Sequence, residues 1–282
     1  MSAVDLDYLR QWLGRTEERS ATIEAEPAAK LSATLDYAGP VVGPGDPLPP
    51  CWHWLYFHEA VPASGLGEDG HPARGGFLPP VALPRRMWAG GRLEFHRPVP
   101  LGEQLTRHST VQGIELKQGS SGPLVFVSVL HRLMRGDSLC IEELQHLVYR
   151  DIAPYSPPKA QETAAQPVQV QRTVTPDEVM LFRYSALTFN SHRIHFDRSY
   201  ATDVEGYPDL VVQGPLTATL LLDLVCREVP DAVVARFEFR GRAPLFAGQR
   251  LDLALSLLGK NVRLRALNPS GQTAMEAEAV LD

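Results

Sequence analysis

The feature that most constrains this chain is an internal repeat. Residues 92–95 (RLEF) lead to 98–105 (PVPLGEQL), and residues 236–239 (RFEF) lead to 244–251 (PLFAGQRL), with two extra residues between the parts of the second copy. An aromatic residue, a proline and a turn glycine can fall in this order by chance in any β protein, but here the spacing to the closing leucine also agrees. We therefore favour a duplication that gives two similar units.

Each copy is followed by short runs of strand type. They lie at residues 124–129 and 144–149 in the first half and at 262–267 and 274–280 in the second. Runs of this length and composition, bounded by turn residues, predict β-strands. Each half is therefore predicted to form an antiparallel meander.

A helix is predicted ahead of the second meander, at residues 214–226 (GPLTATLLLDLVC). It is apolar on almost every face, so it has to be buried. Gly214 as its cap and Pro215 as its first residue leave backbone N–H groups and the positive end of the helix dipole free. A buried helix wrapped by an antiparallel sheet is the hot-dog arrangement. The duplicated chain is thus predicted to be an α+β double hot-dog, with two antiparallel sheets that each wrap a helix.

The first half differs at the equivalent place, residues 77–88 (FLPPVALPRRMW). Its three prolines allow only a short or broken helix. Because the halves are unequal, we expect the second to be catalytic and the first to be supportive. In particular, we expect no proton transfer from His53, His71 or His96.

Two proline-rich segments, residues 39–50 and 151–167, interrupt regular structure. We divide the chain into a non-catalytic N-terminal half (1–150), a linker (151–173) and a catalytic C-terminal half (174–282). The N-terminal half should begin with two helices. One carries Leu6, Leu9 and Leu13 on one face and ends at Gly14, and the other has Pro27 in its first turn, before Leu31 and Leu35.

Composition excludes several classes of protein. Apolar residues make up 44% of the chain and charged residues 21%, which is typical of soluble globular proteins. The net charge of -6 repels a polyanion, so nucleic acid is not an expected partner. No signal-like start and no apolar run of spanning length occur, so we expect a cytoplasmic protein without membrane contact. Cys51, Cys140 and Cys226 form no C-x-x-C, which indicates neither a disulfide framework nor a cysteine zinc site.

The densest polar cluster of the chain is at residues 184–197 (YSALTFNSHRIHFD). It follows a predicted helix that begins at a capping box, residues 175–178 (TPDE), and runs to about Tyr184. Two histidines, an amide, an arginine and a carboxylate between apolar residues suggest a polar loop that faces a pocket. The alternative is a surface loop in which Asp197 merely caps a short helix at 198–201.

At this cluster the sequence resembles the MaoC-like enoyl-thioester hydratases and dehydratases. Their loop has the form D-x-N-P-[LI]-H with an acid two residues on, and V-x-H-G precedes the buried helix. Aligned on His195, the chain has Asn190 in place of the Asp, His192 in place of the Asn, Arg193 in place of the Pro, and residues 212–214 (VQG) in place of V-x-H-G. His195, Asp197 and Gly214 agree with the family pattern.

At the positions that depart from this general pattern, the chain resembles one branch of the family. This branch is the double hot-dog group of mitochondrial-type 3-hydroxyacyl-thioester dehydratases and mesaconyl-CoA and itaconyl-CoA hydratases. Its members read much like S-A-L-T-F-N-x-H-R-I-H-[FY]-D and E-G-Y-P-x-L-V-V-[HQ]-G-P, which residues 185–197 and 205–215 fit closely. In the first half the matching blocks are 48–57, 69–72, 77–80, 85–91 and 148–150. The resemblance implies a hydro-lyase that acts on an acyl-CoA thioester and needs no cofactor.

Hydration of an α,β-unsaturated thioester needs a base for the water, an acid for the α-carbon and donors to the enolate-like oxygen. His195 is the expected base, since an imidazole titrates near neutral pH. Asn190 cannot take a proton, so we expect it to position the water or the substrate carbonyl. His192 and Asp197 remain alternatives for a second proton transfer. The Gly214 N–H is the expected oxyanion donor.

The substrate-binding residues we expect are Arg193, His192, Gln213, Tyr184, Arg86 and Trp88. Arginines at 85, 86 and 193 could hold CoA phosphates or a substrate carboxylate through paired hydrogen bonds. A long cation two residues before the base is costly to bury without an anion, so we expect Arg193 to face the pocket. The alternative is that it pairs with Asp197 or Glu205 and only fixes the loop.

Two further motifs are discounted. Residues 65–70 (GLGEDG) spell G-x-G-x-x-G, but no helix follows, so we interpret them as a turn and not as a dinucleotide site. His192 and His195 could share a metal, but without a clear third ligand nearby no metal is expected.

The predicted function is reversible hydration of a short branched enoyl-CoA, mesaconyl-CoA or itaconyl-CoA, to citramalyl-CoA. A 3-hydroxyacyl-thioester dehydratase of fatty-acid synthesis is the first alternative. A hot-dog thioesterase or a non-catalytic acyl-CoA-binding module is the second. The expected partners are the acyl-CoA and, as the one protein candidate, a second copy of the chain in a homodimer.

Overall fold

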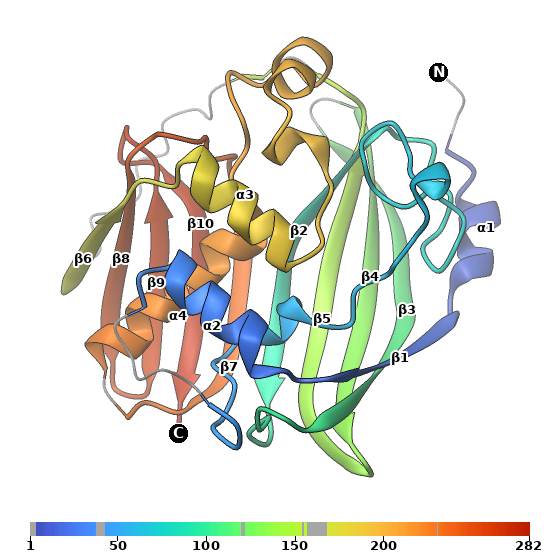
Figure 1. The fold of residues 1–282 in the computed structure, drawn as a ribbon. Helices are drawn as coiled ribbons and strands as arrows, with labels where there is room; N and C mark the ends of the chain where they lie inside the picture. Colours follow the sequence, from blue (N-terminus) through green and yellow to red (C-terminus); the bar gives the residue numbers. More distant parts are fainter. Residues whose placement is uncertain (1–3, 38–42, 120–121, 154, 157–167, 230) are drawn as a thin grey trace.

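The fold is built on one antiparallel sheet. The computed structural model describes residues 4–37, 43–119, 122–153, 155–156, 168–229 and 231–282, and these form ten strands in the order β1-β3-β4-β5-β2-β7-β10-β9-β8-β6 (Figure 1). The strands are β1 (Thr16–Thr22), β2 (Arg85–Phe95), β3 (Gln104–Gly119), β4 (Gly122–Arg135), β5 (Ser138–Arg150), β6 (Val170–Val174), β7 (Val234–Gly241), β8 (Leu251–Leu258), β9 (Asn261–Leu267) and β10 (Thr273–Leu281).

The predicted duplication is visible in the strand order. Strands β2 to β5 and strands β7 to β10 form two meanders with the same internal pairing, and β1 and β6 add one edge strand to each by pairing with β3 and β8. Strands β2 and β7 pair at the middle, so the two expected sheets form one continuous sheet. Gly90 permits this junction, because a Cβ there would lie 2.5 Å from the Phe239 carbonyl oxygen.

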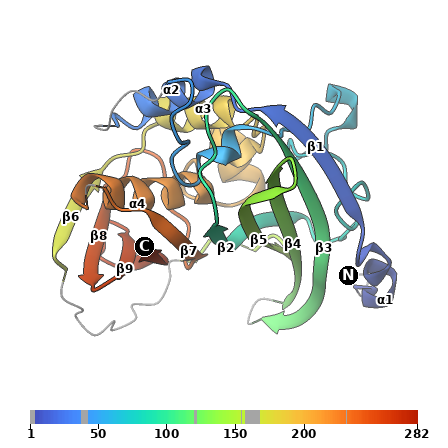
Figure 2. The same ribbon diagram turned by 90° about the horizontal axis from the view of Figure 1, so that it is seen from below.

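In the C-terminal half the sheet wraps the helix α4 (Gly214–Glu228), as the sequence predicts. Ten residues of α4 in succession, Leu216 to Val225, are buried. The cap is Gln213 rather than Gly214, so Gly214 is the first helical residue and Pro215 the second. Figure 2 shows α4 inside the curve of β7 to β10.

The N-terminal half wraps no comparable helix. The proline-rich residues 77–84 form no helix or strand, and Val81 and Leu83 fill the space against the sheet in a core cluster with Val111, Val125 and Tyr149. The expected broken helix at 77–88 is therefore wrong. Its first part is irregular because proline breaks helical hydrogen bonding, and its last four residues belong to β2.

Two longer helices pack together over the sheet, α2 (Ala25–Thr34) and α3 (Glu178–Leu187) (Figure 2). Pro27 lies in the first turn of α2, as predicted. The capping box is displaced by two residues, because Asp177 rather than Thr175 caps α3 by accepting from the Met180 N–H at 2.8 Å. The remaining helical elements are α1 (Leu6–Leu9), η1 (Arg10–Trp12), η2 (Trp52–Leu55), η3 (Ala63–Gly65), η4 (Arg193–His195) and η5 (Tyr200–Val204).

The predicted linker, residues 151–173, lies in large part outside the described residues. Its last four residues belong to strand β6, which pairs with β8. Among the described residues, no helix is both long and apolar enough to cross a membrane.

Candidate active site

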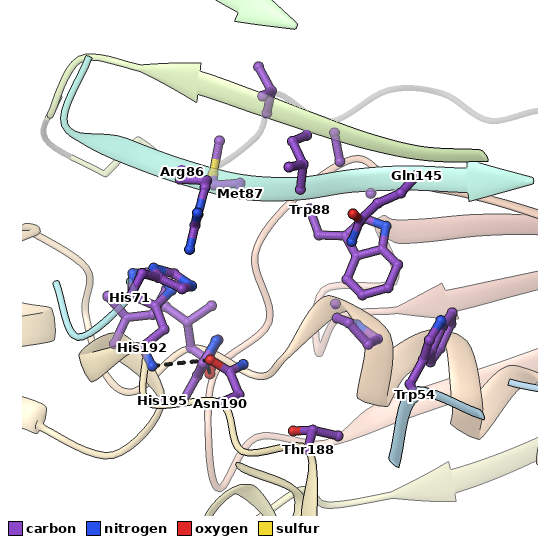
Figure 3. A pocket seen from close by; sticks show the side chains of 18 of the residues that line it. Trp54, His71, Arg86, Met87, Trp88, Gln145, Thr188, Asn190, His192 and His195 are labelled. Atoms are coloured by element: carbon purple, nitrogen blue, oxygen red, sulfur yellow. Dashed lines mark hydrogen bonds between the residues drawn. The ribbon is translucent and has the colours of Figure 1, made fainter. Parts of the chain in front are cut away.

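A cavity of about 980 Å³ lies where the two halves meet. Its walls come from the inner faces of β2, β4 and β5, the proline-rich segment, the loop after α3 and the start of α4. Figure 3 shows side chains from both halves pointing into it. The predicted polar loop thus faces a pocket.

His195 is buried in the cavity wall at the end of η4. Its Nδ1 lies 2.7 Å from the Val211 carbonyl oxygen, which can only accept, so Nδ1 carries the proton and Nε2 keeps its lone pair. Burial lowers the pKa of His195 to about 4, although the Val211 carbonyl opposes this shift. The imidazole is therefore neutral at neutral pH and able to accept a proton at Nε2.

Asn190 closes the turn between α3 and η4. Its N–H donates to the Ser185 carbonyl at 2.8 Å, and its Oδ1 accepts from the His192 N–H at 3.1 Å (Figure 3). With Oδ1 engaged, the side-chain NH₂ is the group left to donate into the cavity, which Asn190 lines. This geometry agrees with a positioning role.

Two of the predicted binding residues, His192 and Tyr184, are buried and line the same wall. Burial, together with the nearby His71, keeps the pKa of His192 well below its usual value. Tyr184 is at the end of α3, and burial raises the pKa of its hydroxyl. Both side chains are therefore neutral at neutral pH.

Gly214 lines the cavity at the first position of α4. The N–H groups of a helix's first turn have no acceptor within the helix, and the dipole there favours negative charge. A Cβ at Gly214 would meet only the Trp88 carbonyl oxygen, at an ordinary 3.5 Å. The N–H, rather than the missing side chain, is thus the useful feature of this position.

Arg86 and Trp88 both enter the cavity from β2 (Figure 3). The Arg86 side chain extends toward His71 and His192. No carboxylate of the described residues lies within 4.0 Å of its guanidinium nitrogens. Trp88 donates to the Gly90 carbonyl at 3.0 Å and forms an aromatic wall of the cavity.

The structure contradicts the expected places of Arg193 and Gln213 in the pocket wall, and it places Asp197 away from the cavity as well. Arg193 is not among the residues that line the cavity, because its guanidinium pairs with Asp197 at 2.7 Å and lies over the Tyr200 ring. Asp197, the alternative left open for a second proton transfer, accepts from the Tyr200 N–H and is not among the residues that line the cavity. Gln213 is fully buried behind the cavity, where its NH₂ donates to Leu181 and Ser185.

Arg85 lines the cavity, but its guanidinium already has a partner. It is buried in an ion pair with Glu205, at 2.5 Å between Nε and Oε2, and lies over the Tyr207 ring. A guanidinium saturated in this way has little capacity to hold a phosphate or a carboxylate. Of the three arginines considered, Arg86 remains as an anion-binding candidate within the cavity.

The sequence reasoning missed His71 as a residue of the site. It lines the cavity, its ring centroid lies 4.2 Å from that of His192, and the His192 ring lies 5.3 Å from that of His195. The D-G-H run at 69–71 was a usable signal, but only the tertiary structure brings it from the other half to the catalytic loop.

The group nearest to a metal site is Asp69, His71 and His192, whose ligand-type atoms lie within 4.8 Å of one another. Asp69 and His71 already hydrogen-bond each other at 3.2 Å. The Arg86 charge acts on all three residues and opposes a second cation. The arrangement therefore suits hydrogen bonding better than metal binding.

A second polar group lines the cavity on the inner face of the N-terminal sheet. The buried Glu143 carboxylate accepts from Trp54 at 3.1 Å and contacts His53 Nε2 at 2.9 Å. Its pKa is lowered, since the hydrogen bonds from His53 and Trp54 outweigh the effect of burial. This end of the cavity is polar, and a long apolar tail would fit it poorly.

A comparison with protein families now decides the identity of the chain. The model described as hydroxyacyl-thioester dehydratase type 2 matches residues 51–247. The chain belongs to this family. It is a MaoC-like hydro-lyase of the hydratase/dehydratase class, which confirms the resemblance and the enzyme class drawn from the sequence.

Relatives extend over nearly the whole chain. Mesaconyl-C(4)-CoA hydratase of Chloroflexus aurantiacus is 45% identical over 271 residues, or 96% of each chain. The mitochondrial hydroxyacyl-thioester dehydratase type 2 of Schizosaccharomyces pombe is 34% identical and covers 83% of this chain and 87% of its own.

Solved structures confirm the fold class. A MaoC-like dehydratase from Phytophthora capsici superposes with a TM-score of 0.69 at 14% identity, over 99% of this chain and 98% of its own. A Mycobacterium tuberculosis protein described as having a double hotdog fold gives 0.58 at 16% identity, over 96% of each chain. The protein thus has a double hot-dog fold.

Proposed function

We propose that this protein reversibly hydrates a short, branched dicarboxylic enoyl-CoA, with mesaconyl-C4-CoA as substrate and citramalyl-CoA as product. The 45% identity to the Chloroflexus aurantiacus hydratase over 96% of both chains supports this substrate. The observation that carries the proposal is one cavity that holds a neutral imidazole, His195, the start of α4 and a cation, Arg86, which has no carboxylate partner among the described residues.

The proposed mechanism follows from these groups. The thioester carbonyl oxygen accepts a hydrogen bond from Gly214 N–H, where the helix dipole stabilises the charge of the enolate. His195 Nε2 takes a proton from water as the water oxygen bonds to the β-carbon. The imidazolium then gives that proton to the α-carbon, and the imidazole is neutral again. Asn190 holds the water or the carbonyl through its NH₂ group.

Arg86 has a defined task in this scheme. In mesaconyl-C4-CoA the carbon that receives water also bears the free carboxylate, so this carboxylate has to lie close to the base. Arg86 extends toward His192, which contacts His195 (Figure 3). A guanidinium can hold a carboxylate through two parallel hydrogen bonds. We therefore assign carboxylate binding to Arg86 in place of Arg193.

The test is a panel of enoyl-CoA substrates. Hydration of each is measured as the loss of the enoyl-thioester absorbance. Mesaconyl-C4-CoA should be hydrated with a higher kcat/KM than itaconyl-CoA, crotonyl-CoA or dodecenoyl-CoA. Arg86→Lys should lower kcat/KM for mesaconyl-C4-CoA roughly tenfold more than for crotonyl-CoA. Arg92→Lys, on the same strand but outside the cavity, is the matched control. Equal losses on both substrates would remove the assignment of Arg86.

The alternative function is that of a 3-hydroxyacyl-thioester dehydratase of fatty-acid synthesis, which the family and the Schizosaccharomyces pombe relative favour. It requires room for a long acyl chain, and kcat/KM would then rise with chain length across the panel. CoA release detected with Ellman's reagent would instead indicate a thioesterase. Binding of every thioester without turnover would leave a non-catalytic module.

A further inference from the structure

A turn of the N-terminal half, residues 67–72, is docked on the catalytic loop. The Arg193 N–H donates to the Asp69 carbonyl at 2.9 Å, and the Ser191 hydroxyl donates to the Gly70 carbonyl at 2.5 Å. Gly70 has a φ of +85°, and a Cβ there would lie 2.0 Å from the Ser191 carbonyl oxygen. The G-x-G-x-x-G run that the sequence offered as a mere turn is therefore part of the active-site framework.

The turn ends by presenting His71 to the cavity. The Asp69 carboxylate accepts from the His71 backbone N–H at 3.0 Å and contacts Nδ1 of its ring at 3.2 Å. Burial alone would raise the pKa of Asp69, but the hydrogen bonds from His71 outweigh it and lower that pKa to about 2. An ionised carboxylate only accepts hydrogen bonds, so Nδ1 of His71 carries a proton and Nε2 holds a lone pair.

The charge state of His71 follows from its neighbours. Burial and the charge of Arg86 lower its pKa to about 4, against the opposing effect of Asp69, and the more distant Arg74 acts in the same direction as Arg86. The fourth group that faces it, His192, is also neutral. His71 is thus a neutral imidazole with one fixed tautomer, able to accept a hydrogen bond but not to donate one at Nε2.

A water molecule that attacks a carbon in a buried site needs an acceptor for each of its two hydrogens, because an unpaired buried O–H is costly and because two acceptors orient an oxygen lone pair toward the carbon. The base, His195, is one acceptor. The NH₂ of Asn190 can only donate, and its Oδ1 is directed at the His192 N–H. His71 lines the same cavity, and no hydrogen bond within the described part of the chain occupies its Nε2.

We propose that His71, oriented by Asp69, is a catalytic residue supplied by the N-terminal half that accepts the second hydrogen of the attacking water. The proposal rests on hydration as the proposed function. One water hydrogen passes to His195 and then to the α-carbon. The other stays on the oxygen, hydrogen-bonded to His71, and becomes the hydroxyl hydrogen of the product. His71 itself gains and loses no proton.

The decisive experiment distinguishes the packing of the His71 ring from the role of its Nε2 atom as a hydrogen-bond acceptor. His71→Phe keeps a ring against His192 but removes the acceptor, and we expect kcat to fall about 10-fold to 100-fold with KM changed little. His71→Gln restores an oxygen acceptor near the position of Nε2 and should recover part of the loss. His96→Phe, at an exposed histidine outside the cavity, is the control and should match the parent.

The Asp69→Asn variant tests the tautomer. An amide allows the imidazole to carry its proton on Nε2, so kcat should fall although His71 remains in place. Thermal unfolding of each variant, with the substrate analogue butyryl-CoA absent and present, verifies that the fold and the binding site persist. If Asp69→Asn unfolds, the comparison of His71→Gln with His71→Phe decides the proposal. If either His71 variant unfolds, the kcat of Asp69→Asn relative to the parent decides it.

Each outcome bears on one proposal. If the parent hydrates no enoyl-CoA, the proposed function fails. If the parent hydrates an enoyl-CoA and His71→Phe keeps kcat within twofold, the role of His71 is overturned while hydration stands. A loss in His71→Phe that appears in KM alone, or that His71→Gln does not relieve, likewise overturns it. All variants are assayed with the enoyl-CoA that the parent hydrates fastest.

Discussion

The two halves of the molecule share one strand plan but fill its concave side differently. In the C-terminal half a fifteen-residue helix, α4, occupies the curve of β7 to β10. In the N-terminal half an extended proline-rich segment takes a much smaller part of the same space, and the cavity occupies the inner face of β2, β4 and β5. The half without a helix thus provides the open cavity, while the helix of the other half brings the positive end of its dipole to that cavity.

The first prediction tests whether the chemistry belongs to the C-terminal loop. His195→Ala should lower kcat/KM for hydration by at least about 100-fold, as expected for loss of a general acid-base group. Circular dichroism and the unfolding midpoint should stay near those of the parent. Near-normal turnover by a folded variant would show that the base lies elsewhere.

The second prediction addresses the N-terminal end of α4, for which the N-terminal half has no counterpart. Gly214→Pro removes one N–H at the first helical position, where proline is tolerated, and should lower kcat about 100-fold. Gly214→Ala keeps the N–H and meets only an ordinary 3.5 Å contact, so it should stay within a few-fold of the parent. Similar losses in both variants would mean that space, and not the donor, matters here.

The third prediction compares how α4 and the proline-rich segment at residues 77–84 stabilise the fold. Leu220 is fully buried in α4, and Leu83 is 6% exposed in the extended segment. Leu220→Ala should cost roughly 3–5 kcal/mol in urea unfolding and Leu83→Ala about 2 kcal/mol, because an irregular segment can collapse more readily around a cavity. The reverse order would contradict the view that α4 is the main support.

The fourth prediction uses pH to separate the buried base from an exposed histidine. The folded pKa of His195 is about 4, below the usual 6.5, so the imidazole stays neutral as pH falls through the usual range. The limb of kcat/KM that reports protonation of the base should therefore appear near pH 4 and not near 6.5. A limb at 6.5 that persists with a substrate of unchanged ionisation would contradict this environment for His195.

The fifth and smallest effect concerns a residue of the catalytic loop that faces away from the cavity. Arg193 is 39% exposed and pairs with Asp197, so Arg193→Lys should change kcat/KM less than about threefold and stability by less than about 1 kcal/mol. The change should be equal for mesaconyl-C4-CoA and crotonyl-CoA. A selective loss on the dicarboxylic substrate would restore Arg193 to the binding site.

Much of the fold follows from local patterns. The repeat predicts two meanders, and the apolar run from Leu216 to Val225 predicts a buried helix, because burial on every face leaves no other solution. The edge strands β1 and β6 were missed, since their alternation is carried by polar residues such as Arg19 and Glu17, whose side chains pair with each other at the surface of the sheet. The packing of Val81 and Leu83 in place of a helix was also beyond local reasoning.

The sequence by itself predicted the polar loop that carries His195 and Asn190, and the helix that begins at Gly214, because these depend on motif and periodicity over a few residues. Only the tertiary structure decided which polar side chains meet. Arg193 turns to the neighbouring Asp197, while Arg86 and His71 come from more than a hundred residues away to line the same cavity. The physical reason is that a side chain's direction depends on the partner that satisfies its charge or hydrogen bond, and that partner is chosen by packing between the halves.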